Sequence, residues 1–422
     1  MQNPRIVFVA PQPPYPLTNG MPIRIFQLLR AYAECGSVKL VFLYQNISQL
    51  EEVMDSVAGI CESAHPVPAT STYGETALAN LPRWRRRLQL ACERRPVAMV
   101  KEFSPDISRI VHELAPRADL VHVTGIHMVP QIEPLLTERS VGVRFVLDLP
   151  DVESARDAKR LRFIPLRSWS RIGFGYYDVL RLWAYQRRVT RWFDQVLVCS
   201  EQERERLTVS NVVVVPNAVN VPIDMPSSDT DGRTLLFCGT LSYPPNVDGL
   251  QYFVRTILPE IRKDIPDVRL LIIGRSPKPE VQALEDGVTI RIVSNPPTVP
   301  EYYAKATVAI VPIRFGGGTR IKILEAWALG VPVVSTPLGC EGLDAIDGEH
   351  LAVAGTPVRF AKACVELLQT PSLRRRLTAR GRELVWRKYR SEAIRSEIVT
   401  MVRKLVGGES VEALASHRRT GQ

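Results

Sequence analysis

Three consecutive glycines and a pair of cations lie close together in the second half of the chain. Gly316 to Gly318 come shortly after an apolar run, residues 306–312, that has the composition of a buried strand. A backbone without Cβ atoms can turn sharply at such a point and approach a ligand closely. Thr319 is expected to cap a helix that begins at Arg320, and Gly330 is expected to end it. The glycines are therefore predicted to lie against the N-terminus of a helix.

This helix start has the chemistry of an anion site. Its free amides and the helix dipole favour a negative charge by about 0.3–1 kcal/mol at an exposed position. Arg320 and Lys322 add two full charges. Glu325, one to two turns further on, would repel a phosphate, so the hydroxyls of a ribose are its better partner. The stretch predicts a site for a nucleoside diphosphate, and the alternative is a flexible glycine loop followed by a solvated glutamate.

A second group of polar residues follows two apolar runs in the first half of the chain. His122 lies within the run DLVHVT, and His127 comes shortly after it. Asp148 lies near the end of the next run, and Asp151 follows that run. Either histidine could contact an acceptor or serve as a packed structural residue. Asp148 or Asp151 could orient a hydroxyl group or cap the next helix.

Short apolar runs separated by segments of helical length must position these residues. The runs of the first half are residues 5–10, 38–44, 119–124, 143–149, 195–200 and 212–216, and those of the second half are residues 234–239, 268–274, 288–293, 306–312, 332–336 and 350–354. Continuous apolar strands that alternate with helices favour parallel sheets covered on both faces. A stretch rich in Pro, Asp and Ser separates the two sets and predicts a linker between two α/β domains. Because ligands of such folds bind beyond the carboxyl ends of the strands, an active site between the domains is expected.

Composition indicates a cytoplasmic protein without a metal site. The seven cysteines are far apart and follow no CxxC or Cys/His pattern, so they are predicted to be reduced core residues. The first residues lack the pattern of a signal peptide, and no apolar run reaches the roughly 18 residues that span a bilayer. Asp229 and Asp231 form the one Asp-x-Asp pattern, but they lie in the polar linker. No metal ion is therefore expected to be required.

The net charge of +10 suits an acidic partner. Basic residues concentrate around Trp84 and in the segment from Arg156 to Phe193, where arginines alternate with aromatic residues. Such a mixture fits a helix that lies on an anionic membrane. Arginines that solvate a helix whose aromatic residues face the core would give the same pattern. Nucleic acid is not expected as a partner, because no nucleic-acid-binding module accompanies the basic runs.

Together with GTLSYPPN at 239–246 and LGCEGL at 338–343, the glycine stretch resembles the nucleotide-sugar half of the GT-B glycosyltransferases. The resemblance is to glycosyltransferase family 4, and within it to bacterial polysaccharide-type sugar transferases. It covers nearly the whole chain and implies an α/β fold with two Rossmann-like parallel-sheet domains facing a cleft. The implied organisation is an acceptor domain at 1–221, a linker at 222–233, a nucleotide-sugar domain at 234–390, a crossover helix at 391–406 that returns to the first domain, and a flexible tail at 407–422.

The resemblance also implies the donor-site residues. Glu325 matches the second of the family's two donor-site glutamates, which holds the ribose hydroxyls, whereas Gly317 takes the place of the first. Gly20 matches one member of a glycine pair that lets the donor phosphate approach. Gly239 begins the motif that follows the first strand of the second domain, where the basic pair of the family is missing. The donor set is therefore Gly20, Gly239, Gly316, Gly317, Gly318, Thr319 and Glu325, with Arg320 and Lys322 as the phosphate-binding cations.

For the acceptor side, the resemblance points to the two histidines and the acidic turn. His122 matches the first position of an HxH-like pattern, Thr124 replaces the second histidine, and His127 could substitute for it. Asp151 lies in a turn that carries a carboxylate near the acceptor in related enzymes. These residues are predicted to contact the acceptor or the transferred sugar.

The implied activity is retaining transfer of a sugar from a nucleotide-sugar donor to a hydroxyl of a sugar or lipid-linked sugar, in polysaccharide or glycolipid assembly. The nucleotide sugar is a substrate, so no cofactor is expected. The place of action would be the cytoplasm, including the inner face of a bacterial membrane. Two alternatives remain open: a GT-B protein that binds a nucleotide or a partner without catalysis, and a sugar-nucleotide epimerase of the same fold.

Overall fold

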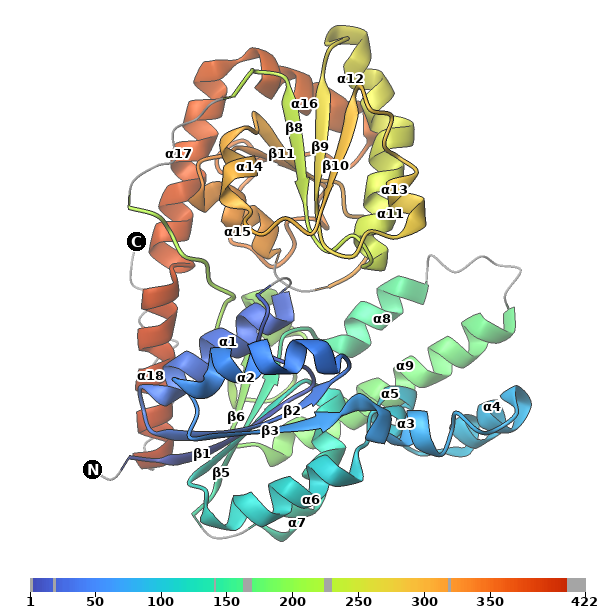
Figure 1. Ribbon diagram of the computed structural model, residues 1–422, viewed down its shortest axis with the longest axis vertical. Helices are drawn as coiled ribbons and strands as arrows, with labels where there is room; N and C mark the ends of the chain where they lie inside the picture. Colours follow the sequence, from blue (N-terminus) through green and yellow to red (C-terminus); the bar gives the residue numbers. More distant parts are fainter. Residues whose placement is uncertain are drawn as a thin grey trace. The chain divides into compact units, whose positions relative to one another are not determined.

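The computed structural model describes residues 3–17, 20–139, 142–161, 169–223, 230–317 and 320–407, which form two α/β units (Figure 1). The first unit holds the described residues up to Pro216 except Gly20, together with those from Arg395 onward. The second unit holds Gly20 and the described residues from Asn217 to Ile394. The predicted linker and tail stay predictions in part, because residues 224–229 and 408–422 lie outside the described ranges.

The first unit is built on a seven-stranded sheet in the order β3-β2-β1-β4-β5-β6-β7, and every strand pair is parallel. Its strands are β1 (Arg5–Ala10), β2 (Ser37–Tyr44), β3 (Ser63–Pro68), β4 (Leu120–Thr124), β5 (Arg144–Leu149), β6 (Gln195–Val198) and β7 (Val212–Val214). Its helices are α1 (Gly20–Ala33), α2 (Leu50–Ala58), α3 (Tyr73–Thr76), α4 (Arg83–Cys92), α5 (Val97–Lys101), α6 (Pro105–Leu114), α7 (Glu133–Glu138), α8 (Glu153–Leu161), α9 (Trp169–Val189) and α10 (Glu201–Glu205). They cover both faces of the sheet (Figure 1).

The edge strand β3 is the one strand of this sheet that the apolar runs do not predict. Its sequence, SAHPVP, contains two prolines and only one fully buried side chain, Val67. Prolines are tolerated in a sheet at its edge, where one row of backbone groups has no partner strand. The strand forms because β2 offers its free edge, with Lys39 opposite Ser63 and Tyr44 opposite Pro68.

The second unit is built on a six-stranded parallel sheet in the order β10-β9-β8-β11-β12-β13. Its strands are β8 (Thr234–Cys238), β9 (Arg269–Gly274), β10 (Ile290–Ser294), β11 (Val308–Val311), β12 (Val333–Ser335) and β13 (Ala352–Val353). The helices that follow β8 are α11 (Pro244–Tyr252), α12 (Leu258–Asp264), α13 (Pro279–Gln282), α14 (Pro300–Ala304), α15 (Ile321–Ala328), α16 (Pro357–Gln369), α17 (Pro371–Lys388) and α18 (Ser391–Gly407). The predicted fold class is confirmed: two parallel sheets with flanking helices.

The last helix, α18, returns to the first unit, as predicted. Its residues from Arg395 onward belong to that unit. The Arg395 guanidinium lies 3.0 Å from a carboxylate oxygen of Glu34, and the Cys35 thiol donates to the Val399 carbonyl at 3.8 Å. The chain therefore ends its described course against the region that follows α1.

Two sequence expectations require correction. Helix α15 begins at Ile321, and its N-cap residue is Arg320, which makes no side-chain cap bond; the predicted cap, Thr319, lies outside the described residues together with Gly318. The expected end of the helix is confirmed, because Gly330 follows it with φ of 78°.

All seven cysteines are free, but Cys92 is exposed on α4 and is not the core residue that was predicted. No helix in the described ranges is both long enough and apolar enough to cross a membrane.

Candidate active site

The strongest ligand-binding feature of the second unit is the Arg320 side chain at the start of α15. Arg320 is only 8% exposed. Its Nη1 donates to the Gly317 carbonyl at 2.7 Å, whereas Nε and Nη2 are buried without a hydrogen-bond partner among the described residues. A buried cation with two unused donors costs free energy unless something pairs with it. The geometry therefore favours an anionic ligand at this point.

Lys322 supplies a second cation on the first turn of the same helix. Its Nζ donates to Asn246 Oδ1 at 2.9 Å and lies 4.3 Å from the centre of the Phe237 ring. Burial lowers the pKa of Lys322 to about 7, and the neighbouring Arg320 charge acts in the same direction. Asn246 is fixed in turn, because its Nδ2 donates to the Thr240 carbonyl at 2.8 Å. The ammonium is held by a neutral amide, which leaves its charge available to a ligand.

Glycines of the predicted donor set make room for these side chains. A Cβ atom on Gly239 would lie 2.9 Å from both Lys322 Nζ and Asn246 Nδ2, so a larger residue would displace the cation. Gly316 has φ of 112° and packs so closely on Pro245 that a Cβ would lie 3.0 Å from its ring. That backbone conformation strains any residue with a Cβ atom. The need for glycine at these two positions is thus explained by close packing around Lys322 and by the turn before α15.

Glu325 lies one turn after Lys322 and is half-buried. Burial raises its pKa to about 7, and the charge of Lys322 opposes that shift. The structure brings Gly239, Gly316, Gly317, Arg320, Lys322 and Glu325 together in the second unit. The ribose contact of Glu325 and the phosphate contact of Gly20, the first residue of α1, stay predictions.

Binding of a nucleoside diphosphate should take up a proton at about pH 8. With a pKa of about 7, Lys322 is mostly neutral there, and a bound diphosphate raises that pKa because it stabilises the ammonium form. Affinity should therefore rise as the pH falls from about 9 to about 7. Calorimetric titration in buffers of different ionisation enthalpy measures the uptake. Lys322→Met should lower the proton uptake, whereas the exposed control Lys305→Met should leave it unchanged. Equal uptake in both variants would refute the assignment.

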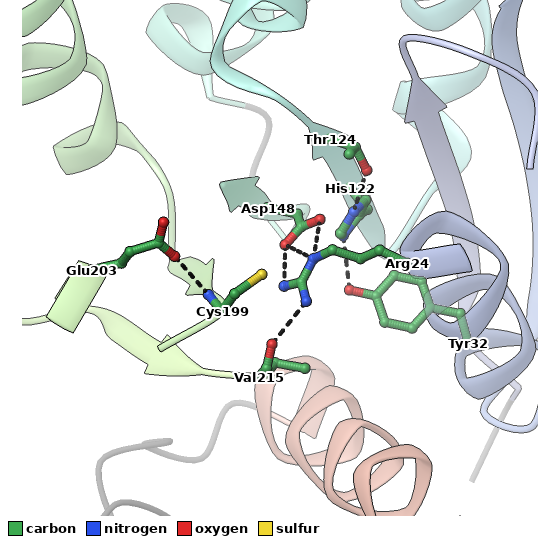
Figure 2. Close-up of polar contacts among 8 residues, drawn as sticks. All are labelled: Arg24, Tyr32, His122, Thr124, Asp148, Cys199, Glu203 and Val215. Carbon is green, nitrogen blue, oxygen red and sulfur yellow. Dashed lines mark hydrogen bonds and ion pairs between the residues drawn. The ribbon is translucent and has the colours of Figure 1, made fainter. Parts of the chain in front are cut away.

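The first unit has a different polar centre, an ion pair between Arg24 on α1 and Asp148 on β5 (Figure 2). Both Asp148 oxygens accept from Arg24 Nε at 2.9 Å, and Arg24 Nη1 donates to the Val215 carbonyl at 2.8 Å. The side chains are 2% and 0% exposed. The pair joins α1, β5 and the residue after β7. Asp148 therefore cannot be the predicted orienter of an acceptor hydroxyl, because its oxygens are buried and held by Arg24.

His122 lies on the same face of the sheet as Asp148, because Thr124, two residues after His122 on β4, is the register partner of Asp148 on β5. One ring nitrogen bonds to the Tyr32 hydroxyl at 2.9 Å and the other to the Thr124 hydroxyl at 3.1 Å (Figure 2). The ring also stacks on Phe8 at 4.1 Å. Burial lowers the pKa of His122 well below its usual value. This geometry favours a neutral structural histidine over a catalytic one.

His127 is a cation held by carboxylates. Its Nδ1 lies 3.1 Å from Glu153 Oε1 and its Nε2 lies 3.4 Å from Glu102 Oε2. The two carboxylates outweigh the effect of burial and raise the pKa of His127 to about 9. Its ring lies so close to Gly125 that a Cβ there would be 2.5 Å from it. His127 therefore remains the better candidate of the two histidines for contact with the acceptor. Its ring is protonated and lies between the carboxylates of Glu102 and Glu153.

Asp151 follows β5 and lies 3.6 Å from the Arg156 guanidinium. It also helps to raise the pKa of Glu203 to about 8, mainly a result of the burial of that carboxyl. Glu203 lies in an arrangement similar to a capping box, because its own amide donates to the hydroxyl of the N-cap residue Ser200. Its carboxylate accepts from the amide of Cys199, the residue before the N-cap (Figure 2). The predicted acceptor residues His127 and Asp151 are thus parts of a dense network of charges after β4 and β5.

Several residues of these networks were not predicted from sequence. Glu203 could have been found, since the spacing Ser200-x-x-Glu203 after an apolar run is typical of a capping box. Arg24 carried a weaker signal, an arginine between two isoleucines of an apolar helical pattern. Asn246 was part of the motif quoted for the family resemblance, but its contact with Lys322 joins segments far apart in sequence. Such contacts depend on the tertiary fold.

Two parallel-sheet units, the second with a glycine turn and buried cations at a helix start, define a protein of the GT-B class. A search of solved structures found sucrose-phosphate synthase from Thermosynechococcus elongatus at TM-score 0.67 and 17% identity, covering 97% of this chain and 100% of that one. Anabaena HepE in complex with UDP and glucose matches at TM-score 0.64 and 10% identity, covering 94% of this chain and 99% of that one. At these identities the likeness is one of fold.

Sequence comparisons narrow the class. The chain matches the model "Glycosyl transferase 4-like domain" over residues 19–219 and the model "Glycosyl transferases group 1" over residues 232–370. It therefore belongs to the family 4-like GT-B glycosyltransferases. A Klebsiella pneumoniae protein described as an uncharacterized 44.6 kDa protein in the cps region is 26% identical over 53% of this chain and 60% of its own length. Phosphatidyl-myo-inositol mannosyltransferase of Mycobacterium leprae is 31% identical over 49% of this chain and 57% of its own length. The matches thus span less than two thirds of these relatives.

Proposed function

We propose that this protein is a retaining glycosyltransferase that moves a sugar from a nucleotide-sugar donor to a hydroxyl of a sugar or lipid-linked sugar. The observation that carries the proposal is the Arg320 guanidinium, which is buried with Nε and Nη2 unpaired among the described residues. Two donors in a planar fork match two oxygens of a phosphate group. The neighbouring Lys322 ammonium adds a second positive charge.

Catalysis in this proposal is positional and electrostatic. Negative charge grows on the nucleoside diphosphate as the bond from its terminal phosphate oxygen to the sugar breaks. Arg320, Lys322 and the amides of Gly316 and Gly317 stabilise that charge, and fixed donors of this kind supply much of the rate enhancement of enzymes. Glu325 binds the ribose hydroxyls. The acceptor hydroxyl attacks from the face that the diphosphate leaves, and the leaving phosphate takes its proton, which retains the anomeric configuration.

The acceptor side is proposed to use His127 and Asp151. Both belong to the charged network after β4 and β5, where carboxylates and a cationic ring can bind hydroxyl groups. Relatives whose names give a phosphatidyl-myo-inositol acceptor and a cps region support a role in glycolipid or polysaccharide assembly. A lipid-linked acceptor would place the enzyme in the cytoplasm at the inner face of the membrane.

Release of nucleoside diphosphate that depends on an acceptor tests the proposal. A panel of nucleoside diphosphates is first screened for thermal stabilisation, since a ligand at 100 times its Kd stabilises by about 2.7 kcal/mol. Nucleotide sugars with the preferred base are then incubated with and without sugar or lipid-linked acceptors. Release only in the presence of an acceptor supports the transferase. Binding without acceptor-dependent release would identify a protein that binds the nucleotide without catalysis.

Chelation by EDTA should leave most of this activity intact. Arg320 and Lys322 can neutralise the diphosphate, and Asp231 is already used in a turn, where it accepts from the Arg233 amide at 2.8 Å and the Thr234 hydroxyl at 3.1 Å. Its predicted partner Asp229 lies outside the described residues. Initial rates before and after chelation provide the measurement. A loss of activity that manganese restores in the parent but not in Asp231→Asn would contradict the linker assignment.

A further inference from the structure

Two neighbouring helices of the first unit expose large apolar side chains beside unpaired arginines. On α9, the exposed side chains Tyr176 (48%), Leu180 (65%) and Trp183 (50%) recur every three to four positions and form one stripe along the helix. Tyr177 (47%) lies beside this stripe. The opposite side of α9, with Leu182, Tyr185 and Val189, packs into the core. Helix α9 therefore carries apolar side chains on two sides: one side packs into the core, and the stripe with Leu180 and Trp183 is exposed.

Helix α4 has the same character. Trp84 and Leu88, one turn apart, are 62% and 59% exposed, whereas Leu90 is buried against Leu78 and Val100. The helix RWRRRLQLAC contains four arginines and no acidic residue. The Arg85 guanidinium lies over the Trp84 ring at 5.1 Å, as the Arg187 guanidinium does over Trp183 on α9 at 5.4 Å.

A buried arginine joins the two helices. Arg181 on α9 donates through Nη1 to the carbonyls of Leu90 and Glu93, at 2.9 and 2.6 Å, at the C-terminal end of α4. Its Nη2 donates to Asp178 at 2.7 Å, and Asp178 also accepts from the Val97 amide at 3.0 Å. The C-terminal end of α4 therefore contacts α9 near its middle, and Figure 1 draws the two helices as neighbours. We name the exposed residues of the two helices the α4/α9 surface.

We propose that the α4/α9 surface docks on an anionic membrane, and this inference extends the membrane-side location in the proposed function. Exposed Arg85, Arg87, Arg94 and Arg187 form no ion pair with a carboxylate in the part of the chain that the structure describes. Aromatic side chains that flank arginines are suited to the boundary between headgroups and acyl chains. An uncharged apolar groove would not need these cations, whereas anionic headgroups pair with them.

A second copy of the chain fits this surface less well. In a twofold dimer the same patch meets itself, so the arginines of one subunit would face those of the other. The surface also differs from the segment that the sequence predicted. Arg156 on α8 is engaged by Asp151, Glu153 and Asp157 and contributes no free charge, and residues 162–168 lie outside the described ranges. The proposed surface therefore combines α4 with α9 and does not include α8 or residues 162–168.

Co-sedimentation with vesicles of phosphatidylcholine, with and without phosphatidylglycerol, tests the docking in the absence of nucleotide. The parent should bind the anionic vesicles, and added salt should weaken the binding because charges are screened over about 8 Å at physiological ionic strength. The triple variant Arg85→Gln, Arg87→Gln, Arg187→Gln should bind about 100-fold more weakly, since each basic residue near such a surface contributes about 1 kcal/mol and 1.4 kcal/mol is tenfold. The matched control changes three exposed arginines of the second unit, Arg255, Arg375 and Arg376, to Gln and should bind like the parent.

The apolar contribution is tested by Leu180→Ser with Trp183→Ser, which should lower binding at least tenfold. Its control is Val288→Ser with Val358→Ser, two side chains of the second unit that are 87% and 53% exposed. Equal loss in variant and control, or equal binding of the parent to neutral and anionic vesicles, would overturn the proposal. Self-association of the parent that the Leu180/Trp183 variant abolishes, without vesicle binding, would assign the surface to a second copy. Arg320→Gln should still bind vesicles, so failure of the docking and failure of the donor site give different results.

Discussion

Replacing Arg320 with Gln should lower turnover by about 10²–10³-fold, the usual cost of removing one charge-stabilising donor from an active site. The substitution removes a guanidinium whose Nε and Nη2 are buried and unpaired among the described residues. It should also remove most of the thermal stabilisation by nucleoside diphosphates. Arg320→Lys should recover only part of the loss, because an ammonium is a point charge and cannot present two parallel donors. Steady-state kinetics and ligand-induced melting shifts are the measurements.

The same variant should fold at least as stably as the parent when no ligand is present. An unpaired buried cation costs free energy, so its removal relieves a penalty while it destroys a binding site. A merely structural arginine would behave in the opposite way, with lower stability and unchanged nucleotide binding. The exposed Arg376 on α17 provides the matched control, and Arg376→Gln should change neither property.

Breaking the ion pair between Arg24 and Asp148 should destabilise the first unit by about 3–5 kcal/mol, because either single change leaves an uncompensated buried charge. Arg24→Met and Asp148→Leu should therefore each shift the urea midpoint strongly. The double variant should recover most of the loss, since two apolar side chains leave no buried charge. Matched changes in an exposed pair, Arg5 and Asp119, should cost less than about 1 kcal/mol, because that pair is 60% and 35% exposed.

An equal loss of stability on breaking the buried pair and the exposed pair would show that the ion pair between Arg24 and Asp148 has no special role in stabilising the first unit. The double variant distinguishes a buried unpaired charge from damaged packing. If packing were the cause, the losses of stability of the two single variants would add in the double variant instead of being recovered. Nucleoside diphosphate binding should survive in variants that stay folded, because the donor residues Arg320 and Lys322 belong to the second unit.

Sequence reasoning found most of the strands because buried parallel strands are continuous apolar runs. It missed β3, whose formation depends on the free edge of β2 rather than on its own residues. It placed Arg320, Lys322 and Glu325 on one helix, since those positions are a few residues apart. It could not distinguish a buried structural histidine from a catalytic one at position 122, because Phe8 and Tyr32 come from distant segments. Residues close together in the sequence could thus be assigned to one element, whereas contacts between distant segments could not be predicted.

Cys92 on α4 gives this chain a built-in attachment point for a reporter group. It is the one exposed thiol of the seven, and the others are buried or half-buried. Burial raises the pKa of Cys35 to about 11 and of Cys61 and Cys238 to about 12, so these thiols rarely form the reactive thiolate. A maleimide dye applied briefly should therefore label Cys92 selectively, so the other six cysteines need not be replaced. Because Cys92 lies one turn after Leu88, the emission colour of a polarity-sensitive dye there would follow the surroundings of α4 in real time.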